Sequence, residues 1–387
     1  MKKESTANAD RLKSSAPLNA DRILRFENVV KNQTPPESLQ KLKSSNSFMI
    51  EESGPFKPED LIQTFELSDG RHAYHIGSRN RVIRGLPMQA FHRLRRDEVR
   101  QNSPTLPLPP PRVPEWADIV YHPKISTGLL RPVMRRVNGK RVRPLYLFGP
   151  GDQRQAFLPQ GYPWQCIGRI FVWTNPFGFP AWSGTGVLVS HNTVLTASHM
   201  VPWNADTAMM QFIPAYFNGV STLGSNVYSY VDNAAAYYSE PDPADKPAWD
   251  FAVLRLIDPL GDSLGWFGAR TYDDSWNDGR FWTLVGYPGA VAGGEQPSFQ
   301  QAIAFHDDDE DGDAMELESD DGDQSPGDSG GPFFAWWEGD GWPSLVAVAS
   351  SEETEWDFPW FGGPEENNVA AGGSPLVDLI QWARNNW

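Results

Sequence analysis

The stretch GTGVLVSHNTVLTASH, residues 184–199, contains two short runs of β-favouring residues, VLV and TVLT, separated by the polar triplet SHN. Short apolar runs bounded by turn-forming residues indicate consecutive β-strands. From about residue 144 onward similar runs follow one another, among them GRIFVW, DFAVLRL, RFWTLVGY and SLVAVAS. The repetition predicts an all-β domain, built as a sandwich or a barrel.

The last residues of the chain, PLVDLIQWARNNW, change to a helical pattern. Their apolar side chains recur at positions i, i+3, i+4 and i+7: Leu376, Leu379, Ile380 and Ala383. This spacing predicts a C-terminal amphipathic helix that packs one face on the β domain.

The chain contains a single cysteine, Cys166, so an intrachain disulfide is excluded. Cys166 lies in an apolar run and has no basic or histidine neighbour in the sequence. We therefore expect a buried structural residue here rather than a reactive thiol.

Charge is distributed unevenly along the chain. Residues 1–150 contain 26 of the 33 Lys and Arg but only 15 of the 49 Asp and Glu. This part therefore carries a net charge of +11 and the rest −27, within a total of −16. Opposite charges on two parts of one chain indicate that the parts attract each other in cis, or that the basic part has an acidic partner.

The basic N-terminal part divides by composition. Residues 1–45 are polar and aperiodic, which predicts disorder. Residues 46–143 form a basic extension with more apolar content, and the segment SPTLPLPPPRVP, 103–114, reads as an extended proline-rich linker. A basic tract at 131–143 precedes the β-rich domain, for which the composition predicts residues 144–387.

The sequence gives no sign of export or of membrane insertion. The N-terminus MKKESTANADRLKSS lacks the apolar core of a secretory signal, and no run approaches the roughly 18 apolar residues of a membrane span. The basic part lacks interleaved aromatic residues and nucleic-acid motifs, so we expect neither nucleic acid nor membrane as a partner. The compartment stays open between the cytoplasm and export by a non-classical route.

Three segments carry residues that suit nucleophilic catalysis. TASH ends a β-run with His199, WDFAVLRL opens one with Asp250, and GDSGGP places Ser329 between glycines. A serine hydroxyl needs an adjacent imidazole to accept its proton, and the imidazole needs a carboxylate to fix its tautomer. Each segment alone would suit a structural role, but together they predict a Ser-His-Asp triad.

The glycines around Ser329 suit a second requirement of such chemistry. Gly327 and Gly330 allow a tight backbone turn. The amide N–H groups of Gly327 and Ser329 are then the candidates for binding the oxyanion that develops on a substrate carbonyl.

Residues 144–387 resemble the trypsin-like serine protease superfamily, and most closely its bacterial and fungal glutamyl-endopeptidase-like branch. The resemblance lies in residues 184–199 and in four further segments: GPGDQR (149–154), YPWQCIGRI (162–170), VGYPG (285–289) and SPGDSGGP (325–332). It implies two antiparallel six-stranded β-barrels with the active site between them. It also implies a serine endopeptidase that acts on protein or peptide substrates and requires no cofactor.

The resemblance also bears on specificity. It implies that Ser350 begins the edge strand that pairs with the substrate backbone. The Glu preference of the branch depends partly on a histidine in the strand after the nucleophile. The matching stretch here, VAVASSEE (346–353), has no histidine, so the resemblance does not imply a Glu preference for this chain. Asp323 lies six residues before Ser329, where trypsins place the aspartate that binds Arg or Lys; it is either that residue or a structural turn residue.

Asp328, directly before the nucleophile, points to control of activity. In zymogen-activated relatives this residue pairs with a newly freed α-amino group and orders the oxyanion loop, whereas other relatives pair it internally. We hypothesise that the basic N-terminal segment is a propeptide, bound in cis and cleaved within residues 135–143. The alternative is an unprocessed accessory region.

The acidic segment DDDEDGDAMELE matches the spacing of a calcium-binding EF-hand loop. Its matching ligand positions are Asp307, Asp309, Asp311 and Glu318. The flanking residues look like two strands of a hairpin rather than two helices, so a solvated acidic hairpin tip is the competing interpretation. A competing function for the whole domain is a catalytically silent binding protein on a protease scaffold.

Overall fold

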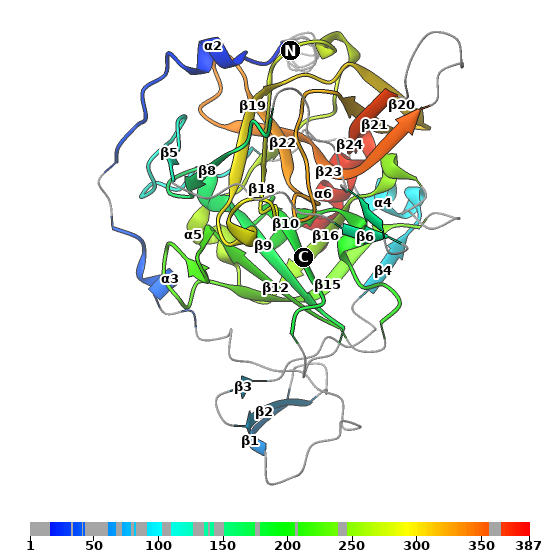
Figure 1. Cartoon of the computed structure of the whole chain (residues 1–387). Helices are drawn as coiled ribbons and strands as arrows, with labels where there is room; N and C mark the ends of the chain where they lie inside the picture. The colour runs from blue at the N-terminus through cyan, green and yellow to red at the C-terminus, as the bar shows by residue number, and fades with distance from the viewer. Residues whose placement is uncertain are drawn as a thin grey trace, which may run out of the picture.

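The computed structural model describes residues 16–31, 34–40, 42, 61–66, 72–78, 81–82, 91–102, 110–126, 135–137, 140–142, 151–174, 179–205, 208–238, 246–355 and 365–387. Figure 1 shows a β-rich body in which the green strands of the first half lie below the yellow-to-red strands of the second half. The predicted all-β class is confirmed, since most of the described elements are strands.

The first half is a closed barrel of six antiparallel strands. These are β9 (Ile167–Trp173), β10 (Trp182–Leu188), β11 (Thr193–Thr196), β12 (Met209–Pro214), β15 (Ser229–Tyr237) and β16 (Ala252–Leu256). Their order is β12-β9-β10-β11-β16-β15, and β12 also pairs with β15, which closes the barrel.

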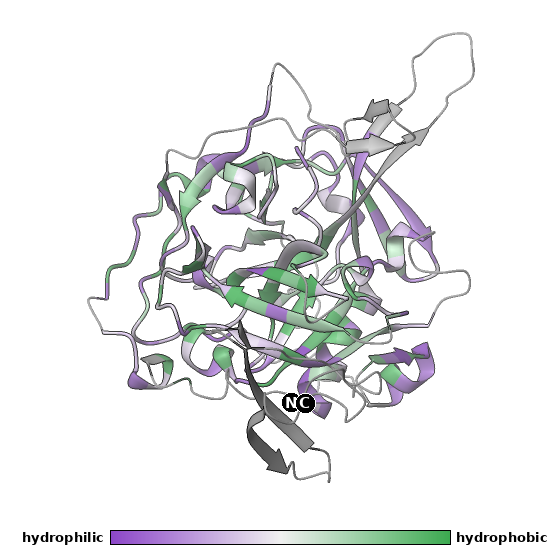
Figure 2. Ribbon diagram, turned by 60° about the horizontal axis from the view of Figure 1, so that its bottom comes forward, coloured by the Kyte–Doolittle hydropathy of each residue, from purple (hydrophilic) through white to green (hydrophobic). Residues whose placement is uncertain are grey.

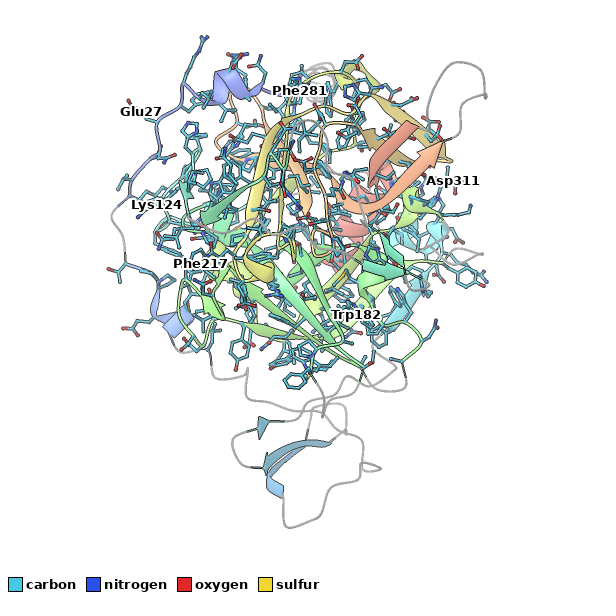
Figure 3. All side chains as sticks on the ribbon, viewed as in Figure 1. Glu27, Lys124, Trp182, Phe217, Phe281 and Asp311 are labelled. Atoms are coloured by element: carbon cyan, nitrogen blue, oxygen red, sulfur yellow. The ribbon has the colours of Figure 1, made fainter. Side chains whose placement is uncertain are left out.

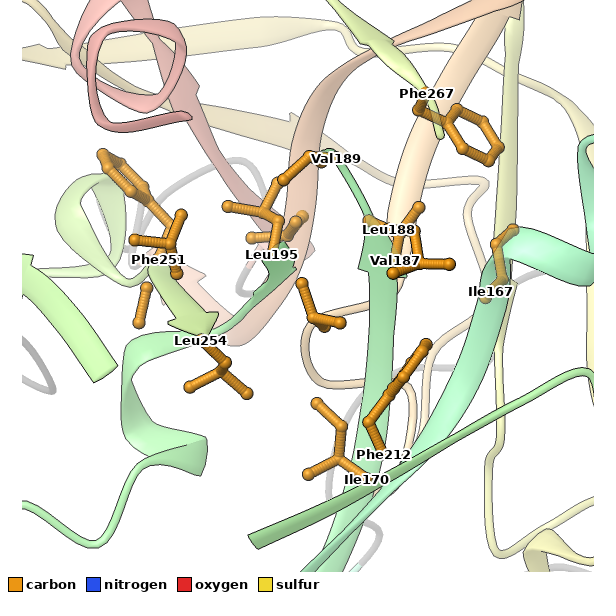
Figure 4. Packing of buried hydrophobic residues seen from close by; sticks show 14 of the residues in the cluster. Ile167, Ile170, Val187, Leu188, Val189, Leu195, Phe212, Phe251, Leu254 and Phe267 are labelled. Atoms are coloured by element: carbon orange, nitrogen blue, oxygen red, sulfur yellow. The ribbon is translucent and has the colours of Figure 1, made fainter. Parts of the chain in front are cut away.

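Apolar side chains from all around the barrel fill its interior. Ile170, Phe212 and Leu254 are each 0% exposed and share the inner face of the barrel strands, and Figure 4 shows Ile170 and Phe212 side by side. Val187 and Leu195, also 0% exposed, pair on the outer face of the same strands. Burying one such side chain stabilises a fold by about 1.5–3 kcal/mol. This core gives the segments that carry His199 and Asp250 a rigid support.

The second half is a larger, mainly antiparallel sheet. Its strands, in spatial order, are β20 (Asp307–Asp311), β21 (Ala314–Ser319), β24 (Glu365–Gly373), β23 (Pro343–Glu355), β22 (Pro332–Trp336), β18 (Trp282–Gly286), β19 (Ser298–Ile303), β8 (Gln155–Leu158) and β5 (Lys124–Ile125), with β17 (Gly268–Ala269) beside β23. The resemblance implied a second closed barrel of six strands. In the described residues this sheet is longer and open, because an acidic hairpin extends one end and a strand from the N-terminal part extends the other.

The predicted C-terminal helix is confirmed as α6 (Ser374–Asn386). Leu376, Leu379, Ile380 and Ala383 are all fully buried, as their spacing predicts. Cys166 is buried as well, and its thiol lies 3.3 Å from the carbonyl of Leu264. Figure 2 shows hydrophobic strands at the centre of the molecule and hydrophilic segments around them.

Short helices, strands and turns complete the described structure. The helices are α3 (Glu37–Gln40) and α5 (Leu260–Leu264), and the strands are β13 (Tyr216–Phe217) and β14 (Val220–Ser221). The 3₁₀ turns are η4 (Trp164–Cys166), η5 (Ser198–Met200), η7 (Pro247–Trp249), η8 (Asp274–Trp276) and η9 (Ala292–Gly294). No helix in the described ranges has both the length and the apolar character needed to cross a bilayer.

Parts of the N-terminal extension belong to the same body. Strand β4 (Phe91–Leu94) adds to the barrel in parallel to β15, and α4 (Arg96–Asn102) follows it and contacts α6. Helix α2 (Ala20–Ile23) lies in a segment whose Leu18 donates its N–H to the Trp336 carbonyl at 2.7 Å. Three further small strands form a separate sheet and two form a hairpin: β1 (Leu61–Glu66), β2 (His72–Ser78), β3 (Arg81–Val82), β6 (Arg135–Val137) and β7 (Lys140–Val142).

This placement differs from the disorder expected for residues 1–45. Within the described residues 16–31, Leu18 and Ile23 are buried against Trp336, and Asn19 caps α2 by accepting the Arg22 N–H at 3.0 Å. A few apolar anchors thus order a stretch whose average composition is polar. Most of the proline-rich linker, 103–109, lies outside the described residues.

Candidate active site

The barrel brings His199 and Asp250 together. His199 lies in η5, directly after β11, and Asp250 follows η7, directly before β16. Strands β11 and β16 are antiparallel neighbours in which Thr196 pairs with Ala252. The end of one strand therefore meets the start of the other, and both residues lie just beyond this shared edge.

The two side chains form a close, oriented pair. His199 Nδ1 donates to Asp250 Oδ2 at 2.6 Å, and the His199 backbone N–H donates to Asp250 Oδ1 at 2.8 Å. The hydroxyl of Ser350, on β23, donates to Asp250 Oδ2 at 2.7 Å. A carboxylate held on both oxygens fixes the imidazole with Nε2 free to accept a proton.

The electrostatics suit a carboxylate beside a basic imidazole. Burial raises the pKa of Asp250, but the His199 charge and the hydrogen bonds from His199 and Ser350 outweigh it, so the pKa is lowered. Burial lowers the pKa of His199, but the Asp250 charge and hydrogen bond outweigh it, so the pKa is raised above 6.5. Asp250 therefore stays ionised and makes His199 a stronger base.

Ser329 lies in a tight loop that packs against the segment before His199. Gly327 and Gly330 have φ of +109° and +80°. A Cβ on Gly330 would lie 2.1 Å from Thr196 Oγ1, so no other residue fits here without displacing β11. Among the described residues no hydrogen bond joins Ser329 Oγ to His199 Nε2, and such contacts often tighten only when substrate binds.

Residues 323–330, here called the nucleophile loop, are held by hydrogen bonds along the backbone. The N–H to carbonyl bonds are Gly289 to Pro326 (2.8 Å), Asp328 to Ser325 (3.0 Å), Gly330 to Ala349 (2.8 Å) and Gly331 to Asp328 (2.7 Å). The bond to Ala349 places the loop beside Ser350, which contacts Asp250. Strand β23 thus connects the nucleophile loop, bonded at Ala349, to the His199–Asp250 pair, bonded at Ser350.

Thr185 on β10 clamps the same loop from the barrel. Its hydroxyl donates to the Gly327 carbonyl at 2.7 Å and accepts the Tyr287 N–H at 2.9 Å. Its backbone N–H donates to the Ser329 carbonyl at 2.9 Å. Thr185 lies in the stretch that indicated the fold, but no pattern in the sequence marks it as part of the site.

Two N–H groups of the nucleophile loop remain unpaired within the described part of the chain. They belong to Gly327 and Ser329, the two residues that the sequence predicts for an oxyanion hole. The peptide carbonyls at residues 326–329 all accept a hydrogen bond. Two free N–H donors held in place by the surrounding hydrogen bonds, beside the Ser329 side chain, suit a developing negative charge.

Asp328 has an internal partner that the sequence analysis missed. Arg154 Nη1 donates to Asp328 Oδ2 at 2.6 Å, and both side chains are 1% exposed. Burial raises the pKa of Asp328 to about 6, a rise that Arg154 limits, so the carboxyl is ionised at neutral pH. A buried carboxylate requires a cation, and residues 151–387 contain only seven Lys and Arg, so Arg154 could have been considered from the sequence.

Asp323 is fully buried and bound to main chain. Its Oδ2 accepts the Gln153 N–H at 2.6 Å, and its own N–H donates to Gln300 Oε1 at 2.7 Å. These bonds favour the structural interpretation of Asp323 over that of a residue reading basic side chains.

The four residues of the EF-hand spacing lie on a hairpin instead of a loop between helices. Asp307, Asp309 and Asp311 lie on β20, and Glu318 lies opposite Asp307 on β21. Glu318 is buried and bonded to Asn367, while Asp311, labelled in Figure 3, pairs with Lys246 at 2.7 Å. In the described residues these carboxylates form no group of three ligand atoms, so the geometry favours the acidic hairpin.

Comparison with known proteins finds similarity to peptidases. The profile of the trypsin-like peptidase domain family matches residues 184–340. The chain is similar to a glutamyl endopeptidase of Bacillus licheniformis, 26% identical over 161 residues that make up 41% of this chain and 47% of that one. It is also similar to a protein named extracellular metalloprotease of Bacillus subtilis, 24% identical over 156 residues, 39% of this chain and 47% of that one.

A solved structure described as Glu endopeptidase in complex with MPD is also similar, with 18% identity and a TM-score of 0.46. The similarity covers 62% of this chain and 99% of that one. The chain spans about half the length of the curated relatives it matches. The match to the trypsin-like peptidase domain family spans residues 184–340, which contain the nucleophile loop and, in whole or in part, every barrel strand except β9, so this part of the chain is similar to trypsin-like peptidase domains.

Proposed function

We propose that this chain is a serine endopeptidase that hydrolyses peptide bonds of proteins or peptides through an acyl-enzyme on Ser329. One observation carries the proposal: the nucleophile loop pairs its backbone groups but leaves the Gly327 and Ser329 N–H groups free, next to an oriented His199–Asp250 pair. A catalytically silent scaffold has no need to keep two such donors unpaired.

In the proposed mechanism His199 Nε2 accepts the proton of Ser329 Oγ as the oxygen attacks the substrate carbonyl. The N–H groups of Gly327 and Ser329 bind the resulting oxyanion. Asp250 stabilises the imidazolium, which then gives its proton to the leaving amine. Water, activated by His199 in the same way, releases the acyl group and restores Ser329.

Strand β23 offers a place for the substrate backbone. Its pairing with β22 ends at Val348, which lies opposite Pro332, and beyond Ala349 no strand among the described residues lies on the edge opposite β24. An extended peptide can add to such an edge by main-chain hydrogen bonds. Ser350 lies at the start of this edge, although its hydroxyl binds Asp250.

Labelling with a fluorophosphonate tests the nucleophile, and a peptide-library cleavage profile tests the activity. The wild-type chain is expected to be labelled once and to cleave peptides, whereas Ser329→Ala does neither. Absence of Ser329-dependent labelling and cleavage would favour the silent binding protein. Equal rates on basic and other side chains would support the structural interpretation of Asp323.

We also propose that the N-terminal segment acts in cis, as a partner of the acidic domain. Arg96 and Arg100 of α4 both pair with Asp313 at the tip of the acidic hairpin, which supports this proposal. Cleavage within residues 135–143 stays a prediction. The mass of the active species checks it, since an intact chain with full activity excludes a requirement for cleavage.

A further inference from the structure

The carboxylate of Asp328 ties the nucleophile loop to a segment outside it. Asp328 Oδ2 accepts both Arg154 Nη1 at 2.6 Å and the Ser325 N–H at 2.9 Å. Arg154 Nη1 also donates to the Ser325 hydroxyl at 2.8 Å. One guanidinium thus contacts both the residue before the nucleophile and the residue that starts the turn toward it.

Arg154 is itself held in one orientation. Its Nε and Nη2 donate to the two carboxylate oxygens of Asp152 at 2.9 and 2.7 Å. The planar guanidinium matches this two-point geometry, so little freedom remains for the end that meets Asp328. Burial lowers the pKa of Arg154, but Asp328 and Asp152 outweigh it, so the group stays charged.

The same segment holds the other end of the loop. The N–H of Gln153, between Asp152 and Arg154, donates to Asp323 Oδ2 at 2.6 Å. Residues 152–154 lead directly into β8, which pairs with both β19 and β5. Residues 152–154, which hold the nucleophile loop through Asp328 and Asp323, are therefore anchored on the second sheet.

Within the described residues, Arg154 is the cation that pairs with Asp328. Oδ2 accepts hydrogen bonds from Arg154 and Ser325, whereas Oδ1 is buried beside Gly286 and has no hydrogen-bond partner among the described residues. A carboxylate this deeply buried needs one cation, and the chain supplies it internally.

We propose that Arg154 is the positioning residue that holds the nucleophile loop in its active conformation, so that catalysis does not depend on a freed α-amino group. The proposal rests on the proposed endopeptidase function. Cleavage within residues 135–143, where it occurs, then leaves the rate per molecule unchanged.

The test uses the full chain and four variants. Arg154→Met removes the charge with similar volume, and Arg154→Lys keeps the charge without the two-point geometry. Arg270→Met is the matched control, because Arg270 is also a largely buried arginine that pairs with an aspartate, Asp340, at 2.7 Å. Ser329→Ala sets the floor of activity. The readouts are kcat and KM on a peptide substrate, affinity for a peptide aldehyde, thermal unfolding and intact mass.

We expect Arg154→Met to lower kcat about 10²-fold, since loss of one oxyanion donor costs about 10²–10³-fold, while KM changes little. Aldehyde affinity falls in parallel, because the aldehyde adduct uses the same donors. Arg154→Lys recovers part of the loss, and Arg270→Met keeps the wild-type kcat. Wild-type chain of intact mass is as active as any shortened form.

Wild-type kcat in folded Arg154→Met would overturn the proposal, as would activity confined to the shortened form of the wild type. If Arg154→Met does not fold, the Arg154→Lys variant tests the proposal instead. Wild-type values of kcat and of aldehyde affinity in Arg154→Lys would then overturn it. A wild-type chain no more active than Ser329→Ala would instead refute the endopeptidase function itself.

Discussion

At the scale of single residues, the site depends on one carboxylate. Asp250 binds the His199 ring, the His199 backbone and the Ser350 hydroxyl at once. The same contacts that orient the imidazole also set its pKa, so geometry and basicity change together when any of them is removed.

The pH dependence of kcat/KM should show this coupling. His199 must be neutral to accept a proton, and its pKa lies above 6.5 because Asp250 outweighs the effect of burial. We expect kcat/KM to fall as pH drops through an apparent pKa above 6.5. Asp250→Asn should lower that pKa and reduce kcat about 10⁴-fold. An apparent pKa at or below 6.5 in the acidic limb of the wild-type kcat/KM profile would contradict the assignment of His199 as the base.

Removal of the third contact should have a smaller effect. Hydrogen bonds to charged groups contribute about 1.5–3 kcal/mol, so Ser350→Ala should lower kcat by about tenfold or more. Ser298 is a buried serine on β19 whose hydroxyl has no hydrogen-bond partner in the described residues, and Ser298→Ala serves as the control. Steady-state kinetics on both variants checks this, and equal kcat values would show that Ser350 does not support Asp250.

At the scale of elements, the acidic hairpin shows how a spacing pattern misleads. Asp307, Asp309 and Asp311 occupy every second position of β20, and the Glu318 carboxylate accepts a hydrogen bond from the Asn367 side chain. A strand separates every second carboxylate by about 6.6–6.8 Å along its axis, whereas calcium needs oxygens at about 2.3–2.6 Å from one centre. The template describes a loop, and this sequence forms strands there.

Calcium and chelator should therefore leave the fold unchanged. We expect the same Tm in the presence of excess Ca²⁺ and of EDTA, because ligand binding to the folded state alone would raise Tm with concentration. Differential scanning calorimetry at both conditions measures it. A Ca²⁺-dependent rise that Asp309→Asn abolishes would restore the calcium interpretation.

At the scale of the whole molecule, the N-terminal extension is part of the folded body. Val99 of α4 is 0% exposed and belongs to the main hydrophobic core, and β4 extends the barrel. Val99→Ala should cost about 2 kcal/mol through lost burial and a cavity, which lowers Tm by about 4–8 °C. Val30→Ala, at a side chain 61% exposed, should leave Tm unchanged. Equal Tm values would show that α4 adds no stability.

The sequence predicted what is local or periodic. His199, Asp250 and Ser329 sit in short segments with distinctive neighbours, and the barrel strands and α6 follow their apolar spacing. The Arg154–Asp328 pair joins residues 174 positions apart, which no spacing in the chain indicates. The open second sheet depends on β5 and β20, a weak strand of two residues and an acidic run, which only tertiary contacts make part of the sheet.

The Thr185 clamp bears on how the protein could be divided into fragments. Thr185, His199 and Asp250 come from the barrel, and the loop they serve comes from the second sheet. A chain break between β16 and β18 would leave His199, the proposed base, on the N-terminal fragment and Ser329, the proposed nucleophile, on the C-terminal fragment. Neither piece alone would react with a fluorophosphonate, and reassociation of the two would restore labelling, so the chain is suited to a split reporter of proximity.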